Sequence, residues 1–511
     1  MLSRTALGAA CILAAAFGQA QAQAPLSAID WLSDSLAMPA AIVPPAGQDD
    51  IAVSALPEDV TVTELGHPSP DAVGLFPVSV TGLPPDLWGS SSSLDLARRF
   101  RAERGDVLPA LQDLLYKLLL AELEPPVDAG ARPTLFLARI DTLLSLGAVE
   151  QADALLKRAG THDPEIFRRR FDTALLLGTE DQVCQAMLNM PDLSPTYPTR
   201  IFCLARGGDW DTAAVTLETA RALGVTSDAD DMLLASFLDP EIADPSQLLP
   251  ATSRPSPLVF RMMEAIGEPL PTANLPRAFA HADLNANAGW KAQIEAAERL
   301  ARTGAIDPNR LLGLYTERRP AASGGVWDRA AVIQKLDAAI TLRDAAAVGA
   351  ALPEAWDAMA SVELETALAT LYGQPLADLP LEGATATLAY HLQLLSDQYE
   401  TTALAHTPAT AKDRLLRAIA TGDLAGVTVS DPVEAAIVEG FSITGIPVRL
   451  RSLTDENRLG EAILRAMELF TEGSSGDLDQ VSDALTFLRS VGLEDTARRA
   501  ALQLLLLDRR G

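Results

Sequence analysis

The chain has 511 residues and a formal net charge of −28 at pH 7, and aromatic residues make up only 5% of it. This acidity argues against binding to nucleic acid, whose phosphates would be repelled, and against attachment to anionic lipid through basic residues. The scarcity of aromatic residues and the abundance of Ala and Leu favour packed helices over a β-sandwich. After the leader described next, no apolar run approaches the roughly 18 residues of a transmembrane helix, so none is expected.

The first residues have the features of a secretory signal peptide: a basic residue, a short apolar run and a small-residue cleavage site. Arg4 supplies the charge, residues 6–17 form the run, and Ala-Gln-Ala at 20–22 forms the site, so residues 1–22 are expected to be removed. One alternative is a membrane anchor, for which the run is too short. Another is a lipoprotein attached through Cys11, which lacks the large apolar residue expected three positions earlier. We therefore expect a soluble periplasmic protein.

Residues 23–91 are predicted to form an extended, proline-rich arm, because prolines at this density prevent long helices. The apolar residues between 75 and 88 would be costly to leave in water, so the arm is expected to contact the helical body, at least in part. The alternative is a disordered linker. Trp31 and Trp88 bracket the arm and are possible anchors to the body or to a partner. Burial in the core is the commoner fate of such residues.

From residue 92 onwards, apolar residues recur with the three- and four-residue spacing of buried helical faces. Glycines at 147, 178 and 208 are separated by 31 and 30 residues and stand between amphipathic stretches. A glycine supplies the left-handed residue that ends one helix and turns into the next. This period is that of one helix-turn-helix unit of the tetratricopeptide kind, although the full consensus is absent.

These patterns predict an all-α fold, namely an α-solenoid or superhelix of antiparallel helix pairs with an N-terminal extended arm. Asp-Pro pairs at 163, 307 and 431 each predict a helix start, with the carboxylate as cap and the proline at the first position. Prolines concentrated between 239 and 257 predict an internal boundary. The predicted domains are an N-terminal helical-repeat domain over 92–240 and a C-terminal helical domain over 258–511.

Two cysteines, Cys184 and Cys203, remain after the expected cleavage. They fall on consecutive predicted helices with a proline-rich turn between them, so antiparallel packing would bring them face to face. In an oxidising compartment such a pair predicts a disulfide, worth about 3 kcal/mol in the chain-entropy model. The alternatives are two buried free thiols or a redox pair, for which the typical CxxC spacing is absent.

No motif indicates catalysis, a cofactor or a metal. The histidines are scattered, HExxH is absent, and neither GxSxG, SxxK nor a nucleotide-binding glycine loop occurs. The acidic residues are too numerous for a glycosidase pair to stand out. We therefore predict no catalytic, cofactor-binding or metal-binding residue.

Several segments carry a family resemblance: SAIDWLSDSL (27–36), ALPEDVTVTELG (55–66), LPPDLWG (83–89), PSPLVFRMMEAIGEPLP (255–271) and GLEDTARRAALQLLLL (492–507). Together with the Ala-rich leader, they resemble an uncharacterised family of bacterial envelope proteins labelled "antifreeze glycopeptide related protein". The resemblance spans nearly the whole chain. It implies a place in the envelope and brings no catalytic residues.

The leading functional hypothesis is a non-catalytic periplasmic scaffold that binds a protein or an envelope polymer along a concave surface. An alternative is an enzyme that acts on peptidoglycan, or its accessory factor, built on a superhelical scaffold. Such an enzyme requires a Glu in an apolar cleft, and no segment departs from the helical pattern enough to indicate one. A third hypothesis is a purely structural component of the envelope.

Overall fold

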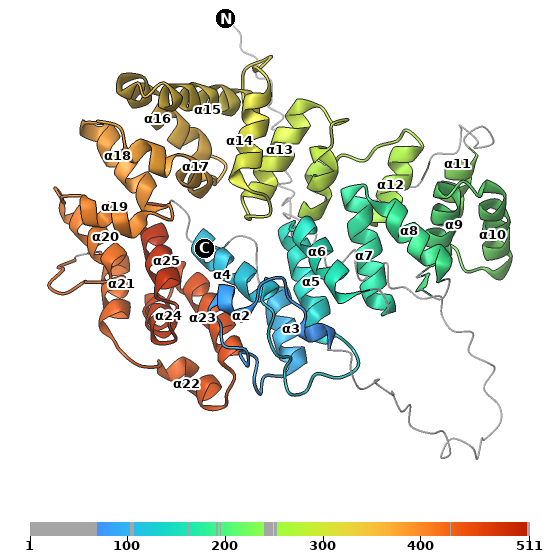
Figure 1. Cartoon of the computed structure of the whole chain (residues 1–511), viewed down its shortest axis with the longest axis horizontal. Coiled ribbons are helices and arrows are strands. Elements are labelled where there is room, and N and C mark those ends of the chain that lie inside the picture. Colours follow the sequence, from blue (N-terminus) through green and yellow to red (C-terminus); the bar gives the residue numbers. More distant parts are fainter. Residues whose placement is uncertain are drawn as a thin grey trace, which may run out of the picture.

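The computed structural model describes residues 69–102, 107–160, 163–190, 193–194, 196–239, 249, 253–429 and 431–507. The predicted signal peptide, most of the predicted arm and Trp31 lie outside these residues. The chain is about 70% helical and its described residues contain no strand, which confirms the all-α fold class (Figure 1). None of the described helices combines the length and the apolar character needed to cross a membrane.

The first helices follow the end of the predicted arm. They are η2 (Pro70–Ala72), α2 (Val78–Thr81), α3 (Ser93–Ala102), α4 (Pro109–Leu120), α5 (Thr134–Leu146) and α6 (Val149–Ala159). The leucines that recur at helical spacing in α4 are buried, with Leu111, Leu115 and Leu118 inaccessible to solvent. α5 is buried on nearly all sides and forms the centre of this part of the molecule.

The next six helices form a lobe at one end of the molecule (Figure 1). They are α7 (Pro164–Leu177), α8 (Glu180–Asn189), α9 (Tyr197–Arg206), α10 (Trp210–Leu223), α11 (Asp228–Leu238) and α12 (Pro257–Ala265). The predicted glycine corners are confirmed. Gly147 ends α5 with φ 82° and Gly178 ends α7 with φ 72°, while Gly208 has φ 84° between α9 and α10.

The remaining helices curve around the other side of the molecule and return to its N-terminal part. They are η4 (Thr272–Asn274), η5 (Arg277–Leu284), α13 (Trp290–Ala301), α14 (Pro308–Glu317), α15 (Val326–Thr341), α16 (Ala345–Ala360), α17 (Glu365–Ala377), α18 (Gly383–Leu394), α19 (Tyr399–Ala405), α20 (Ala411–Thr421), α21 (Pro432–Ser442), α22 (Val448–Asp455), α23 (Leu459–Ser474), α24 (Leu478–Ser490) and α25 (Glu494–Leu506). The predicted caps Asp163, Asp307 and Asp431 accept hydrogen bonds from the first turns of α7, α14 and α21.

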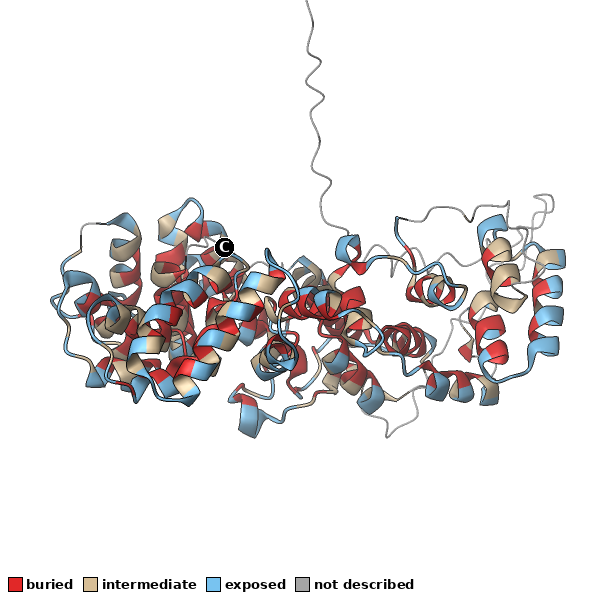
Figure 2. Ribbon diagram, turned by 90° about the horizontal axis from the view of Figure 1, so that it is seen from above, coloured by how far each residue is buried: buried red, intermediate tan, exposed pale blue. Residues whose placement is uncertain are grey.

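Buried apolar side chains form two clusters. The larger joins residues 83–176 to residues 260–507, and the smaller lies within residues 167–262 and fills the lobe. α7 contributes to both, because Ile166 and Leu176 belong to the larger cluster and Phe171 to the smaller. The larger cluster thus crosses the predicted boundary at 240–258, and the domain division itself stays a prediction. In Figure 2 the molecule is a flattened body whose buried residues line the contacts between helices.

The two ends of the described chain pack together, since α3 and α4 lie beside α23 and α25 (Figure 1). The backbone N–H of Ala110 in α4 donates a hydrogen bond of 2.8 Å to the side-chain oxygen of Gln503 in α25. The N-cap residue of α4, Leu108, has no side chain that can accept such a bond, so Gln503 satisfies one of the free N–H groups at this helix start. The solenoid arrangement stays a prediction, whereas the packing of α3 and α4 against α23 and α25 is a feature of the structure.

The described part of the predicted arm is fixed to the helical body by a buried arginine. Arg139 of α5 is 1% exposed, and burial lowers its pKa to about 10, so it remains charged at neutral pH. Its guanidinium donates to the backbone carbonyls of Val73, Leu119 and Ala121 at 2.8, 2.8 and 3.0 Å. The arm and the end of α4 are thereby held by one side chain.

A second attachment involves Trp88, one of the two predicted anchors. Its side chain is 1% exposed and packs edge-on against Phe100 of α3, with ring centroids 5.7 Å apart. The other side of the indole lies against Gly460 at the start of α23. Trp88 thus fills the junction between the N-terminal and C-terminal helices, and Trp31 lies outside the described residues.

Candidate interaction surface

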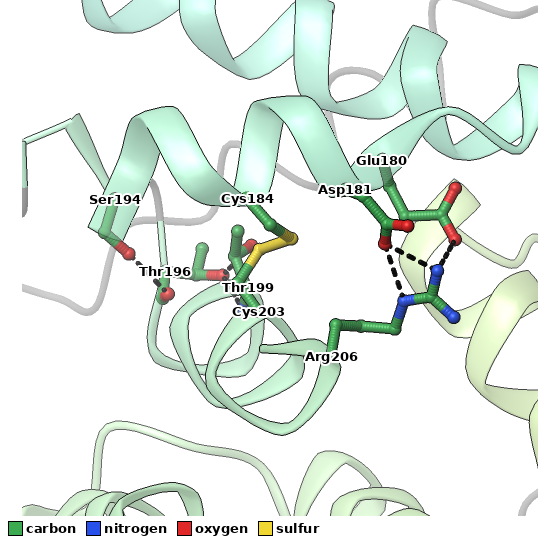
Figure 3. Close-up of a disulfide and its surroundings, with 8 residues drawn as sticks. All are labelled: Glu180, Asp181, Cys184, Ser194, Thr196, Thr199, Cys203 and Arg206. Carbon is green, nitrogen blue, oxygen red and sulfur yellow. Dashed lines mark hydrogen bonds and ion pairs between the residues drawn. A yellow bond between two sulfur atoms is a disulfide. The ribbon is translucent and has the colours of Figure 1, made fainter. Parts of the chain in front are cut away.

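The lobe is held together by the cysteine pair singled out in the sequence. Cys184 of α8 and Cys203 of α9 are buried and lie at disulfide distance, with their Cα atoms 5.0 Å apart (Figure 3). Arg206 of α9 adds ion pairs at 2.6 Å to Asp181 and at 3.4 Å to Glu180 on the same side of the helix pair. The cysteine pair and the ion pairs therefore join α8 to α9 at two adjacent places, and α10 and α11 pack against α9.

Aromatic side chains connect α9 to α10 and α11. Phe202 of α9 is buried and stacks on Phe237 of α11 with ring centroids 5.5 Å apart. Trp210, the first residue of α10, lies 6.2 Å from the same Phe237 ring. The three rings join the helices around the smaller apolar cluster and leave α10 at the edge of the lobe (Figures 1 and 2).

The outer side of α10 is unusually apolar for an exposed helix. Only Ala213, Leu217 and Ala220 of this helix are buried, and they form the side that faces α9. Val215 and Leu223 lie off that face and are 67% and 60% exposed. Large apolar side chains gathered on one exposed face of a soluble protein typically mark a place where something else binds.

A groove of about 1330 Å³ runs between α10 and α11. Its apolar lining includes Val215, Leu217 and Leu223 from α10, and Met232 and Leu238 from α11. Leu249, beyond the end of α11, also lines the groove, and exposed residues such as Val215 and Leu223 leave it an open channel and not a closed cavity.

The surroundings of the groove are strongly acidic. Between residues 207 and 239, Arg221 is the only basic residue, and the acidic ones are Asp209, Asp211, Glu218, Asp228, Asp230, Asp231 and Asp239. Arg221 pairs with Glu218 at 2.7 Å and with Asp231 at 3.4 Å, so one cation serves two carboxylates. The electrostatic potential at the groove therefore favours a positively charged ligand.

The alternative enzyme hypothesis requires a Glu in an apolar environment, and Glu298 of α13 is one of the buried glutamates among the described residues. It is 5% exposed and accepts a hydrogen bond of 2.7 Å from the hydroxyl of Tyr315. Arg329 donates to both of its carboxylate oxygens at 2.7 and 2.6 Å. The carboxylate is thus engaged by side chains that join three helices, an arrangement that stabilises packing.

No metal site emerges from the described residues, where no three His, Cys, Asp or Glu side chains converge as a bound ion would require. The sequence analysis did not single out the α10–α11 groove. A signal for it exists: Val215 falls on the side of α10 opposite to Ala213, Leu217 and Ala220, so this helix has apolar residues on two sides.

Comparisons with known proteins give no relative for this chain. No family model matches it, and neither a curated protein nor a solved structure matches it at a significant level. The resemblance to an envelope family therefore stays a prediction, and the surface of the molecule provides the grounds for assigning a function.

Proposed function

We propose that the protein is a non-catalytic periplasmic scaffold that binds a partner protein in the α10–α11 groove. The observation that carries this proposal is the combination of exposed apolar residues on α10 with a nearly unbroken set of acidic residues around them. A periplasmic location accords with the leader-like N-terminus and with a cysteine pair at disulfide distance, since disulfides persist in oxidising compartments.

The size of the groove points to a polypeptide segment as the ligand. Its volume of about 1330 Å³ exceeds the about 300–1,000 Å³ that is usual for small-molecule pockets. An amphipathic helix binds such channels by placing its apolar face between two helices. The acidic rim adds a requirement for Lys or Arg on the polar face of that helix, because opposite charges pair across an interface and like charges are costly.

A second copy of this chain is a poorer occupant of the groove. A symmetric dimer would place the same surface of both subunits together. The acidic residues of α10 and α11 would then face one another and repel. The proposal therefore commits to a basic, amphipathic segment of a different protein.

The test uses the full exported protein and a labelled synthetic peptide, a helical amphipath made of Leu and Lys, whose binding is followed by fluorescence anisotropy. The double substitution Val215→Ser and Leu223→Ser removes exposed apolar groups, so it should leave folding intact and weaken binding at least about tenfold. The matched control is Leu342→Ser, which removes a 78% exposed leucine at the end of α15 and should change affinity less than about twofold.

Specificity comes from two further comparisons. A Leu and Glu peptide of the same length should not bind, and added salt should weaken the Leu and Lys peptide. Equal binding of both peptides, or equal effects of the groove and control substitutions, would refute the proposed groove. Release of soluble fragments from purified peptidoglycan by the wild-type protein would refute its non-catalytic character.

A further inference from the structure

We propose that a second site, in the pocket formed by α17, α18 and α19, binds an uncharged, hydroxyl-rich ligand the size of one or two sugar residues. The pocket has a volume of about 330 Å³ and lies in the C-terminal arc, away from the α10–α11 lobe (Figure 1). This volume falls at the lower end of the range for small-molecule sites, which is about 300–1,000 Å³. The site is independent of the groove proposed above.

The lining of this pocket carries no Asp, Glu, Lys or Arg, although these residues make up 21% of the chain. Besides Tyr390 and His406, its polar groups are the amides and hydroxyls of five side chains, Gln374, Gln393, Gln398, Thr401 and Thr402. Within the described part of the chain none of these five side chains makes a hydrogen bond, so their donors and acceptors are available to a ligand. Neutral groups of this kind pair with ligand hydroxyls in both directions.

The arrangement of these side chains is built into the fold. Gly373 of α17 lies so close to the turn between α18 and α19 that a Cβ there would be 3.0 Å from Cβ of Ser396. The Ser396 hydroxyl donates to the Gln393 carbonyl at 2.7 Å and accepts from the Gln398 N–H at 3.1 Å. This close approach helps to hold together Gln374 of α17, Gln393 of α18 and Gln398 at the start of α19, all of which line the pocket.

An aromatic pair forms another part of the wall. The rings of Tyr390 and His406 stack with centroids 3.7 Å apart and an interplanar angle of 15°. Tyr390 is 4% exposed, and its hydroxyl has no hydrogen-bond partner in the described structure. Burial raises the pKa of Tyr390 to about 12, so this group remains a neutral donor and acceptor at physiological pH.

A saccharide matches these features better than a charged metabolite does. An ion in this pocket would lose part of its hydration and find no Asp, Glu, Lys or Arg among the lining residues, which is a costly exchange. A neutral sugar has hydroxyls around its edge for the amides and apolar C–H faces for the floor formed by Leu376, Leu379 and Ala389.

The experiment is calorimetric titration of the full exported protein with neutral probes, namely glucose and glucose oligomers of two and four units. Glucuronate and glucosamine serve as charged probes of the same ring size. Affinity should rise from one to two units and then level off, because the pocket has no room for more. The charged probes should bind at least about tenfold more weakly, the penalty for desolvating an unpaired ion.

Two matched pairs of variants test the location. Ala405→Trp fills the pocket and should abolish binding, whereas Leu404→Trp alters the neighbouring exposed residue of α19 and should leave binding unchanged. Thr402→Val removes one lining hydroxyl and should weaken binding about three- to tenfold. Thr387→Val, on an exposed part of α18 outside the pocket, should have no effect.

Three outcomes would overturn this inference. They are no binding of any neutral probe at millimolar concentration, preferential binding of a charged probe, and saccharide binding that survives Ala405→Trp. Loss of peptide binding in the Val215 and Leu223 variants has no bearing on these titrations, so failure of one site is distinguishable from failure of the other.

Discussion

The indole ring of Trp88 lies directly against Gly460, where an added Cβ would overlap ring atoms Cε3 and Cζ3. The backbone N–H of Gly460 also donates a hydrogen bond of 2.8 Å to the carbonyl of Leu87. Glycine is thus required at the start of α23 because a tryptophan from the end of the predicted arm occupies the space of its side chain.

Replacing this glycine should open the junction between the two ends of the chain. We expect Gly460→Ala to destabilise the protein by about 1–3 kcal/mol, the usual cost of overpacking a buried contact. Gly476→Ala is the control, since an added Cβ there meets no atom within 4 Å. Thermal unfolding followed by circular dichroism measures both variants. Equal melting temperatures for the two would contradict the close approach of Trp88.

The cysteine pair predicts the oxidation state of its two sulfur atoms in the purified protein. Cys184 and Cys203 should titrate as a disulfide, so neither should contribute a free thiol to the unreduced, unfolded protein. Reduction, or the double substitution to serine, should lower the free energy of unfolding by about 3 kcal/mol in the chain-entropy model. Finding two free thiols in protein purified from the periplasm would show that the pair stays reduced.

Arg139 should be among the residues least tolerant of substitution. Arg139→Met retains most of the side-chain volume but leaves the buried carbonyls of Val73, Leu119 and Ala121 without their donor. We expect a loss of about 3 kcal/mol or more in denaturant unfolding. Arg132→Met removes an arginine that is 72% exposed and should cost less than about 1 kcal/mol. A similar loss for both variants would contradict the bridging role of Arg139.

Asp172 of α7 should make stability depend on pH. Burial raises its pKa from 3.8 to about 7, against the opposing effect of Arg168 and Arg169. The folded state therefore keeps a proton that the unfolded state loses, so this residue lowers stability progressively as pH rises from about 4 to 7. Asp172→Asn should stabilise the protein at pH 8 by on the order of a few kcal/mol and have little effect at pH 4.

Urea unfolding at the two pH values measures the effect of Asp172→Asn, with the exposed Asp211→Asn as the control. The control should show no such difference between pH 4 and pH 8. A variant whose stability has the same pH dependence as the wild type would show that Asp172 is ionised in the folded protein.

Much of the fold could be predicted because its signals are local. Gly147 and Gly178 end helices because a single glycine readily adopts the left-handed backbone conformation that stops a helix. Asp307 begins a helix because its carboxylate and the next proline suit a helix start. The proximity of Cys184 and Cys203 also followed from two helices and a short turn.

Other features had no local signal. The hydrogen bond between Ala110 and Gln503 joins distant parts of the chain, and nothing near either residue indicates the other. The neutral pocket was missed for a similar reason, since Gln374, Gln393 and Thr402 are ordinary polar residues of three separate helices. The packing of α17, α18 and α19, including the close contact at Gly373, brings them together, and a glycine within a helical pattern has many possible causes.

The bond from Ala110 to Gln503 also has a consequence for the order in which the protein matures. The donor lies at the start of α4, which is synthesised early, whereas the acceptor belongs to the last described helix, α25. A growing chain lacks this hydrogen bond at the start of α4 until Gln503 has been synthesised. This contact therefore forms only after the 393 positions that separate Ala110 from Gln503 have been made.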